Sequence, residues 1–211
     1  MDTETSRILN ALPASSESRP DSRGAQDLKD LDKAKLGQVS IFWGNGKGKT
    51  TSALGTAIRA LGNGYTVHLV QFMKNGASTL EQQIPGEIIS LQIFHNFSYK
   101  RFGLGDWYVR GKNDQAHKEN INETLEYLKS CMGKYDIIIA DELLYAVHLG
   151  LLSEQAVIDL IKNKPKHQEL IITGSHISFP NIFEHAHLVT EIKKIKHPYD
   201  SGIIARQGIE Y

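Results

Sequence analysis

One short segment limits the possible folds of this chain more than any other. Residues 44–51 read GNGKGKTT and stand between an apolar run at 39–43 and a helical pattern at 50–61. A glycine-rich loop between a strand and a helix is the setting of a phosphate-binding loop, because glycines let consecutive backbone N–H groups turn toward anionic oxygens. The N-terminus of the following helix adds a positive dipole end. The segment therefore predicts an α/β fold that binds a polyphosphate.

The loop also predicts roles for its residues. Lys49 would neutralise phosphate charge, and the hydroxyl of Thr50 could ligate Mg²⁺. The usual pattern, G-x-x-x-x-G-K-[ST], needs a glycine five positions before Gly48, where this chain has Trp43. The loop is thus one residue short and should hold a polyphosphate differently from ordinary nucleoside triphosphatases. A dinucleotide fingerprint fits less well, because its third glycine would fall on Lys49. The residues expected to contact the nucleotide are Gly44, Asn45, Gly46, Lys47, Gly48, Lys49, Thr50 and Thr51.

The rest of the chain alternates between strand and helix patterns. This alternation predicts a mostly parallel sheet with flanking helices, of the P-loop NTPase (RecA-like) type. Helices are expected at 50–61, around 121–132 and at 151–163, the last with Ser153 as its N-cap. Residues 1–37 contain no aromatic residue and are expected to form a polar tail with a possible short helix, ahead of one domain at 38–211. Strands are expected at 39–43, 67–72, 88–94, 135–140, 170–173 and 188–192.

Two acidic residues follow the apolar run YDIIIA at 135–140. Such a run is typical of a strand buried on both faces of a parallel sheet, and the ligands of these sheets bind at the carboxyl ends of the strands. Asp141 and Glu142 stand at that end. An acidic pair alone is common on protein surfaces, but behind a phosphate loop it favours a second anchor for Mg²⁺.

Several segments together resemble one family, the P-loop ATP:corrinoid adenosyltransferases. They are GNGKGKTT at 44–51, VQFMKNG at 70–76, IIADELLYA at 138–146, ITG at 172–174 and KHPYDSGIIARQGIEY at 196–211. The resemblance covers about residues 38–211 and implies transfer of the 5′-deoxyadenosyl group of ATP to Co(I) of a corrinoid, with release of triphosphate. It implies Lys49 and Glu142 as catalytic residues, and Thr50 and Glu142 as Mg²⁺ ligands with Asp141 in support. It also implies an electron donor that produces Co(I), and family members are commonly homodimers.

The same resemblance implies a corrinoid-facing segment that is rich in aromatic residues. In the family, aromatic side chains near the lower face of the corrin displace the axial ligand of Co(II), which makes the cobalt easier to reduce. The corresponding candidates here are Phe97, Tyr99, Phe102, Trp107 and Tyr108, between a predicted strand and the long helix. These aromatics could instead pack on the core. Relatives usually have an arginine where this chain has Ser175, so Lys47, Lys74 or Arg206 would have to replace that cation.

Composition disfavours other classes of function. Basic and acidic residues number 24 each, and this balance argues against a general nucleic-acid binder. No apolar run approaches the ~20 residues that cross a membrane, and the single Cys131 excludes an internal disulfide and a paired-cysteine zinc site. With no targeting signal expected, a cytoplasmic location is predicted. Two alternatives stay open: a nucleotide or nucleoside kinase on the same fold, and a catalytically impaired regulatory homologue that binds ATP or corrinoid.

Overall fold

The computed structural model describes residues 33–74, 84–106 and 108–210. Most of the predicted polar tail therefore lies outside the described residues, and so does Trp107. Lys33–Lys35 form one 3-10 turn, η2, just before the first strand. Across the described part of the chain, no helix combines the length and apolar character needed to span a membrane. The proposed division into a tail at 1–37 and a domain at 38–211 stays a prediction.

A six-stranded parallel sheet forms the centre of the described chain. Its strands lie in the order β3-β2-β4-β5-β1-β6, and each neighbouring pair is parallel. All five residues of β2 and of β4 are buried, as expected for strands covered on both faces. This confirms the predicted fold class. The strands are β1 (Val39–Trp43), β2 (Val67–Gln71), β3 (Phe97–Arg101), β4 (Ile137–Asp141), β5 (Glu169–Thr173) and β6 (Leu188–Glu191).

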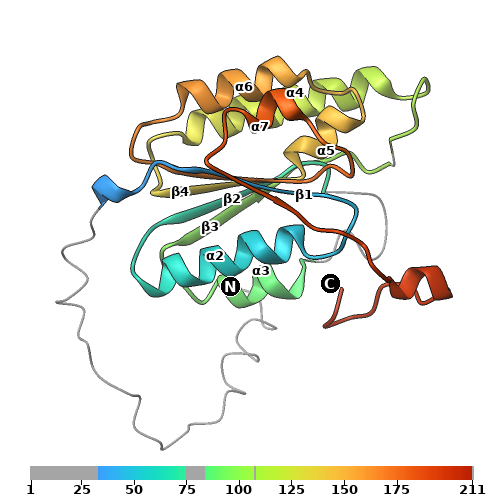
Figure 1. The fold of residues 1–211 in the computed structure, drawn as a ribbon, viewed down its shortest axis with the longest axis horizontal. Helices are drawn as coiled ribbons and strands as arrows, with labels where there is room; N and C mark the ends of the chain where they lie inside the picture. The colour runs from blue at the N-terminus through green and yellow to red at the C-terminus, as the bar shows by residue number, and fades with distance from the viewer. Residues whose placement is uncertain (1–32, 75–83, 107, 211) are drawn as a thin grey trace, which may run out of the picture. The chain divides into compact units, whose positions relative to one another are not determined.

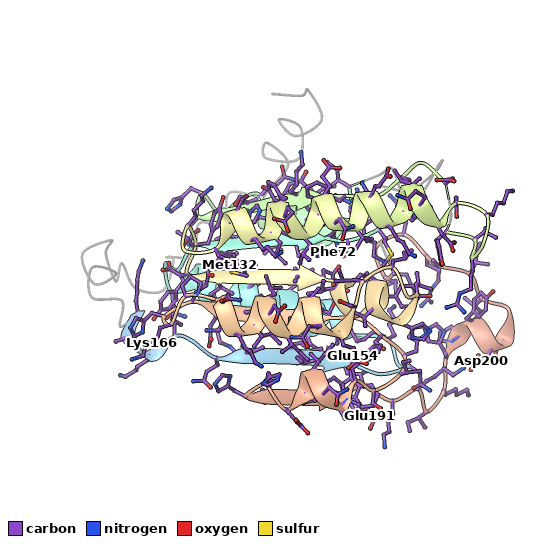
Figure 2. All side chains as sticks on the ribbon, turned by 90° about the horizontal axis from the view of Figure 1, so that it is seen from above. Phe72, Met132, Glu154, Lys166, Glu191 and Asp200 are labelled. Atoms are coloured by element: carbon purple, nitrogen blue, oxygen red, sulfur yellow. The ribbon has the colours of Figure 1, made fainter. Side chains whose placement is uncertain are left out.

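Helices cover both faces of the sheet (Figure 1). On one face lie α2 (Lys49–Gly62) and α3 (Gly86–Leu91). On the other lie α4 (Asp114–Cys131), α5 (Leu143–His148), α6 (Glu154–Asn163) and α7 (Pro180–Phe183). Seen from above, α4 and α6 run side by side over the strands (Figure 2). Each face has its own apolar core between sheet and helices.

The helical patterns predicted α2, α4 and α6 correctly. Ser153 caps α6 as expected, since its hydroxyl oxygen accepts a hydrogen bond from the N–H of Ala156 at 3.2 Å. Cys131 is buried at the end of α4, where it packs as a small core residue. A further 3-10 helix, η3 (Pro198–Ser201), lies in the C-terminal segment.

The strand predicted at 88–94 is wrong. Gly86–Leu91 form α3, and the third strand begins only at Phe97. Ile88 and Leu91 are buried, whereas Ile89 is 39% exposed, which is the spacing of a short helix with one apolar face. An apolar run of this length fits a strand and a helix equally well, so its neighbours in the fold decide the outcome.

Candidate active site

The phosphate loop joins β1 to α2 and is held by segments that are distant in sequence. The Nζ of Lys49 donates to the carbonyl oxygens of Gly44 and Gly46, both at 2.8 Å. The N–H of Gly44 donates to the carbonyl of Ser175 at 3.0 Å, and that of Gly46 to the carbonyl of Ile192 at 2.7 Å. A Cβ on Gly44 would lie 2.4 Å from the Ile192 oxygen, and one on Gly46 2.8 Å from it. Both positions therefore require glycine.

The start of α2 supplies backbone donors next to this loop. Ser52 donates its N–H to the carbonyl of Gly48 at 2.8 Å, which closes the first helical turn. The three preceding N–H groups, of Lys49, Thr50 and Thr51, have no earlier turn to bond to. All three residues line the main cavity, so the helix N-terminus suits an anion there.

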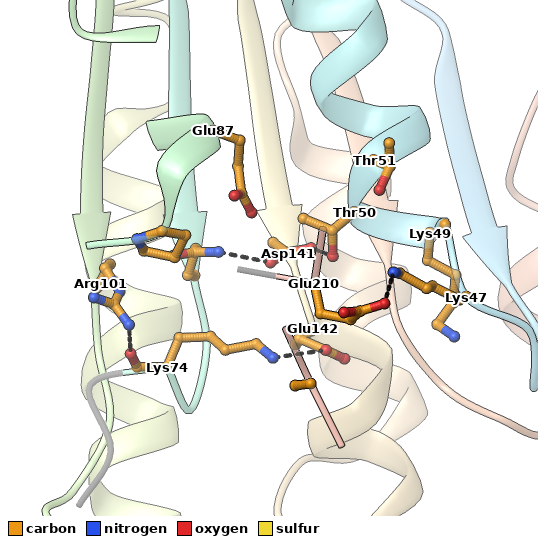
Figure 3. A pocket seen from close by; sticks show the side chains of 14 residues that line it. Lys47, Lys49, Thr50, Thr51, Lys74, Glu87, Arg101, Asp141, Glu142 and Glu210 are labelled. Carbon is orange, nitrogen blue, oxygen red and sulfur yellow. Dashed lines mark hydrogen bonds and ion pairs between the residues drawn. The ribbon is translucent and has the colours of Figure 1, made fainter. Parts of the chain in front are cut away.

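This cavity has a volume of about 520 Å³ and lies where β2, β3 and β4 end, beside the loop that follows β1 (Figure 3). It brings together residues 47–51 of the phosphate loop and both predicted acids. Lys47, Lys49 and Lys74 bring three cations to its wall that could contact a polyphosphate, beside four carboxylates. Its volume is in the range of pockets that hold molecules of nucleotide size. The other lining residues are Gln71, Pro85, Glu87, Arg101, Ala205 and Glu210.

Asp141 is fully buried and joins the ends of three strands to the loop. Its Oδ1 accepts hydrogen bonds from the hydroxyls of Thr50 at 2.8 Å and Thr173 at 2.6 Å. Its Oδ2 accepts from the side-chain amide of Gln71 at 2.9 Å (Figure 3). Because the Thr50 hydroxyl donates to Asp141, its lone pairs stay available to a cation. The sequence did not identify Gln71 and Thr173, although a polar residue ending a buried strand was a usable signal.

Glu142 lies beside this cluster in a strained backbone conformation. Its φ is 62°, and its N–H donates to the Thr173 hydroxyl oxygen at 3.0 Å. Its carboxylate lies 3.2 Å from the Nζ of Lys74 (Figure 3). Met73, with φ 55°, and Ser175, with φ 70°, are the other non-glycine residues with positive φ in the described ranges. The three follow β4, β2 and β5 at one edge of the sheet, and such strain collects at functional sites.

The oxygen donors at this edge fit Mg²⁺. The Thr50 hydroxyl and the Glu142 carboxylate are hard oxygen ligands, and Mg²⁺ is usually held by one or two carboxylates together with waters and substrate phosphates. Such a site needs no larger cluster of side chains. Within residues 33–74, 84–106 and 108–210, no group of three or more His, Cys, Asp and Glu side chains gathers around a common point.

Burial and nearby charges shift the pKa values of Lys49 and His176. Burial lowers the pKa of Lys49, the nearby Lys74 ammonium lowers it further, and the Glu142 carboxylate opposes both. Burial also lowers the pKa of His176, and the positive charge of Lys49 acts in the same direction. A bound polyphosphate would favour the charged form of both groups, because it brings negative charge next to them.

The C-terminal segment closes the loop side of the cavity. The Nζ of Lys47 donates to Oε1 of Glu210 at 2.8 Å and to the carbonyl of Ile209 at 3.2 Å. The Arg206 guanidinium bonds the same carboxylate, and these two cations lower the pKa of Glu210 to about 2. Glu210 is a cavity residue that the sequence did not identify, because no local pattern indicated where the tail packs.

The predicted aromatic segment divides in the structure. Phe97 and Tyr99 are part of the edge strand β3 rather than a loop. Phe102 is buried in the core, with its ring 5.1 Å from that of Tyr127. Tyr108 borders a second cavity of about 210 Å³, which shares Lys74 and Glu142 with the first. Trp107 lies outside the described residues.

Several known proteins with a similar sequence are corrinoid adenosyltransferases. A family model described as ATP:corrinoid adenosyltransferase BtuR/CobO/CobP matches residues 35–211. The corrinoid adenosyltransferase CobA of Salmonella typhimurium is 32% identical over 200 residues, which cover 88% of this chain and 95% of that protein. The corrinoid adenosyltransferase of Escherichia coli is 32% identical over 182 residues, with 83% and 86% covered. That of Pseudomonas aeruginosa is 32% identical over 180 residues, with 83% and 84% covered.

Proposed function

Because this chain belongs to the ATP:corrinoid adenosyltransferase family, and is thus an enzyme that transfers the adenosyl group of ATP to a corrinoid, we propose that ATP binds in the 520 Å³ cavity with its triphosphate over the phosphate loop. One observation carries the proposal. The cavity combines three lysines and a helix N-terminus with two oxygen donors for a cation, Thr50 and Glu142.

The proposed acceptor atom is Co(I) of the corrinoid. Its electron pair forms the bond to C5′ of the ribose, while the bond between C5′ and the α-phosphate oxygen breaks and its electrons leave with inorganic triphosphate. Co(I) carries no proton, so the reaction needs no general base. The protein has to stabilise the leaving group and to orient C5′ toward cobalt.

The lysines are the proposed partners of the leaving group. Lys49 holds two carbonyls of its own loop in the structure, and we expect it to exchange them for phosphate oxygens when ATP binds. Lys47 and Lys74 also line the cavity and supply the cations that relatives have in an arginine. Ser175 cannot replace that arginine, because its hydroxyl carries no charge and is bonded to the backbone of Ile177.

Thr50 and Glu142 are the proposed ligands of Mg²⁺. When bound, this ion would neutralise part of the triphosphate charge. Asp141 contributes by fixing the Thr50 hydroxyl through the 2.8 Å hydrogen bond. On the corrinoid side, Tyr108 borders the adjoining cavity and is the proposed contact. The electron donor, a homodimer and a cytoplasmic location stay predictions from the family resemblance and the composition.

The products of the reaction test this proposal against the two alternatives. The protein is incubated with ATP, Mg²⁺ and chemically reduced cobalamin, and the cobalamin spectrum and the phosphorus products are followed together. We expect adenosylcobalamin with one equivalent of triphosphate and no ADP. Stoichiometric ADP with a phosphorylated acceptor would show a kinase, and ATP binding without turnover would show a regulatory homologue.

A further inference from the structure

The C-terminal segment, residues 193–210, lies beside the phosphate loop and contains no buried residue. Its η3 helix projects away from the sheet (Figure 1). Polar contacts fix the segment on either side of η3. Before η3, the N–H of Lys194 donates to Oδ1 of Asn45 at 2.8 Å, and after it, Glu210 accepts from Lys47. A segment held in this way can move without exposing an apolar core.

The Glu210 carboxylate binds here as a phosphate group could. Its Oε1 accepts from Nζ of Lys47 at 2.8 Å and from Nη2 of Arg206 at 3.1 Å (Figure 3). Its Oε2 accepts from the backbone N–H of Arg206 at 2.8 Å and from Nε of the same residue at 3.2 Å. Lysine, guanidinium and backbone N–H groups are also the donors that bind phosphate in proteins. Glu210 borders the cavity, so it holds one of the three cavity lysines in place of a phosphate oxygen.

A triphosphate over the phosphate loop would compete with Glu210 for Lys47. Two of the three N–H donors of Lys47 are used, by Glu210 and by the carbonyl oxygen of Ile209. A phosphate group drawn to this ammonium would lie close to the Glu210 carboxylate, and the two negative charges repel each other. The Lys47 side chain is 44% exposed, and ion pairs at such positions are weak. A ligand with several negative charges can therefore take the place of this single carboxylate.

We propose that the triphosphate group displaces Glu210 from Lys47, and that the return of this carboxylate helps to expel the triphosphate product. The inference rests on the proposed function, since that function places the triphosphate over the phosphate loop. Glu210 lowers the affinity for ATP and for triphosphate alike, so it leaves the adenosyl-transfer step itself unchanged. At saturating ATP its effect is to shorten the time for which the product blocks the cavity.

Binding of inorganic triphosphate to the full-length protein tests this inference. Isothermal titration calorimetry with Mg²⁺ compares the unmodified protein with Glu210→Gln, which keeps the shape of the side chain and removes its charge. We expect Glu210→Gln to bind triphosphate about 5-fold more tightly, the upper end for an exposed ion pair. Glu191→Gln is the matched control and should bind as the unmodified protein does, because Glu191 is also exposed and paired with a lysine but does not border the cavity.

A double replacement distinguishes competition for Lys47 from repulsion at a distance. Lys47→Met should weaken triphosphate binding by itself. In that background Glu210→Gln should change the affinity by less than about 2-fold, because the two anions no longer share a lysine. An undiminished gain would show that Glu210 acts through its charge alone and would overturn the inference. Equal or weaker triphosphate binding by the single variant Glu210→Gln would overturn it as well.

Cleavage by trypsin after Arg206 reports the movement of the segment. In the unmodified protein Glu210 binds the Arg206 guanidinium and links it to Lys47, which limits access for the protease. Added triphosphate should therefore accelerate this cleavage, and in Glu210→Gln the cleavage should be fast with or without triphosphate. Slower cleavage of the unmodified protein with triphosphate would show that the segment closes over the ligand, which contradicts displacement.

Failure of the proposed function would give a different result. If adenosyl transfer is absent but Glu210→Gln still binds triphosphate more tightly, the inference holds and the proposed reaction is wrong. Normal transfer with equal triphosphate affinities in the two proteins refutes the inference alone. Triphosphate binding to neither protein would refute both.

Discussion

Replacing Asp141 by asparagine should disturb the fold far less than replacing it by alanine. The asparagine carbonyl can take the place of Oδ1 and accept the hydroxyls of Thr50 and Thr173. Its NH₂ group would then face the NH₂ group of Gln71. A half-turn of the Gln71 amide removes this conflict, because the Oε1 of Gln71 is buried and has no hydrogen-bond partner in the described structure. The number of unpaired atoms therefore stays the same.

Alanine offers no acceptor, so all three donors lose their partner. Each buried donor left unpaired costs about 1–3 kcal/mol. The two hydroxyls can rotate toward other acceptors, and removal of a buried carboxylate regains its desolvation free energy. We therefore expect Asp141→Ala to lower the free energy of unfolding by about 2–4 kcal/mol, and Asp141→Asn by about 1 kcal/mol or less.

Urea unfolding of the two variants measures this difference, with Glu123→Ala on the exposed face of α4 as a surface control. Activity adds a second readout. Asp141→Asn keeps the acceptor for Thr50 but loses the negative charge, so the Mg²⁺ concentration for half-maximal rate should rise. Equal destabilisation by asparagine and alanine would refute the reasoning from the hydrogen bonds. An alanine variant as stable as the unmodified protein would refute it as well.

Three further predictions concern single substitutions, of Lys49, Phe102 and His68. Lys49→Ala should nearly abolish transfer with little change in fold, because it removes a cation from the leaving triphosphate, and near-normal turnover would exclude its role. Phe102→Ala should lower the free energy of unfolding by about 3 kcal/mol and reduce assays from Co(II) and from preformed Co(I) equally, since the ring packs on Tyr127. A selective loss from Co(II) would show that the ring faces the corrinoid instead. Burial lowers the pKa of His68 to about 4. As the pH falls, this side chain is therefore protonated at a higher pH in the unfolded protein than in the folded one. The free energy of unfolding should then fall as the pH drops from about 6.5 to about 4. In His68→Gln the free energy of unfolding should fall less over the same pH range.

Local chemistry explains which parts of the site the sequence could predict. The phosphate loop and the two acids at the end of β4 are recognisable because each depends on residues adjacent in the chain. Buried strands such as β4 are equally clear, since an apolar run of this kind suits a sheet covered on both faces.

The hydrogen-bonded partners of Asp141 depend instead on the order of the strands. Gln71 and Thr173 end β2 and β5, and they reach Asp141 only because β4 lies between these strands. An alternating strand–helix pattern does not fix that order. The position of the C-terminal tail over Lys47 is a long-range contact of the same kind.

Aromatic residues pose a different problem for the sequence. Their density at 97–108 is the same whether they pack in the core or face a ligand. Burial separates the two cases, and it places Phe102 in the core while Tyr108 borders a cavity. The run at 88–94 is ambiguous for a similar reason, because five to seven apolar residues carry too little periodicity to distinguish helix from strand.

The left-handed residues Met73, Glu142 and Ser175 indicate where heat tolerance could be gained and what would be lost. A side chain in this conformation costs about 1–2 kcal/mol relative to ordinary backbone. Glycine at any of the three positions relieves that strain, although it also increases the conformational freedom of the unfolded chain. All three residues stand at the edge of the sheet that carries the cavities. Selection for thermostability alone would therefore favour glycine at these three positions. A variant stabilised in this way should have lower activity.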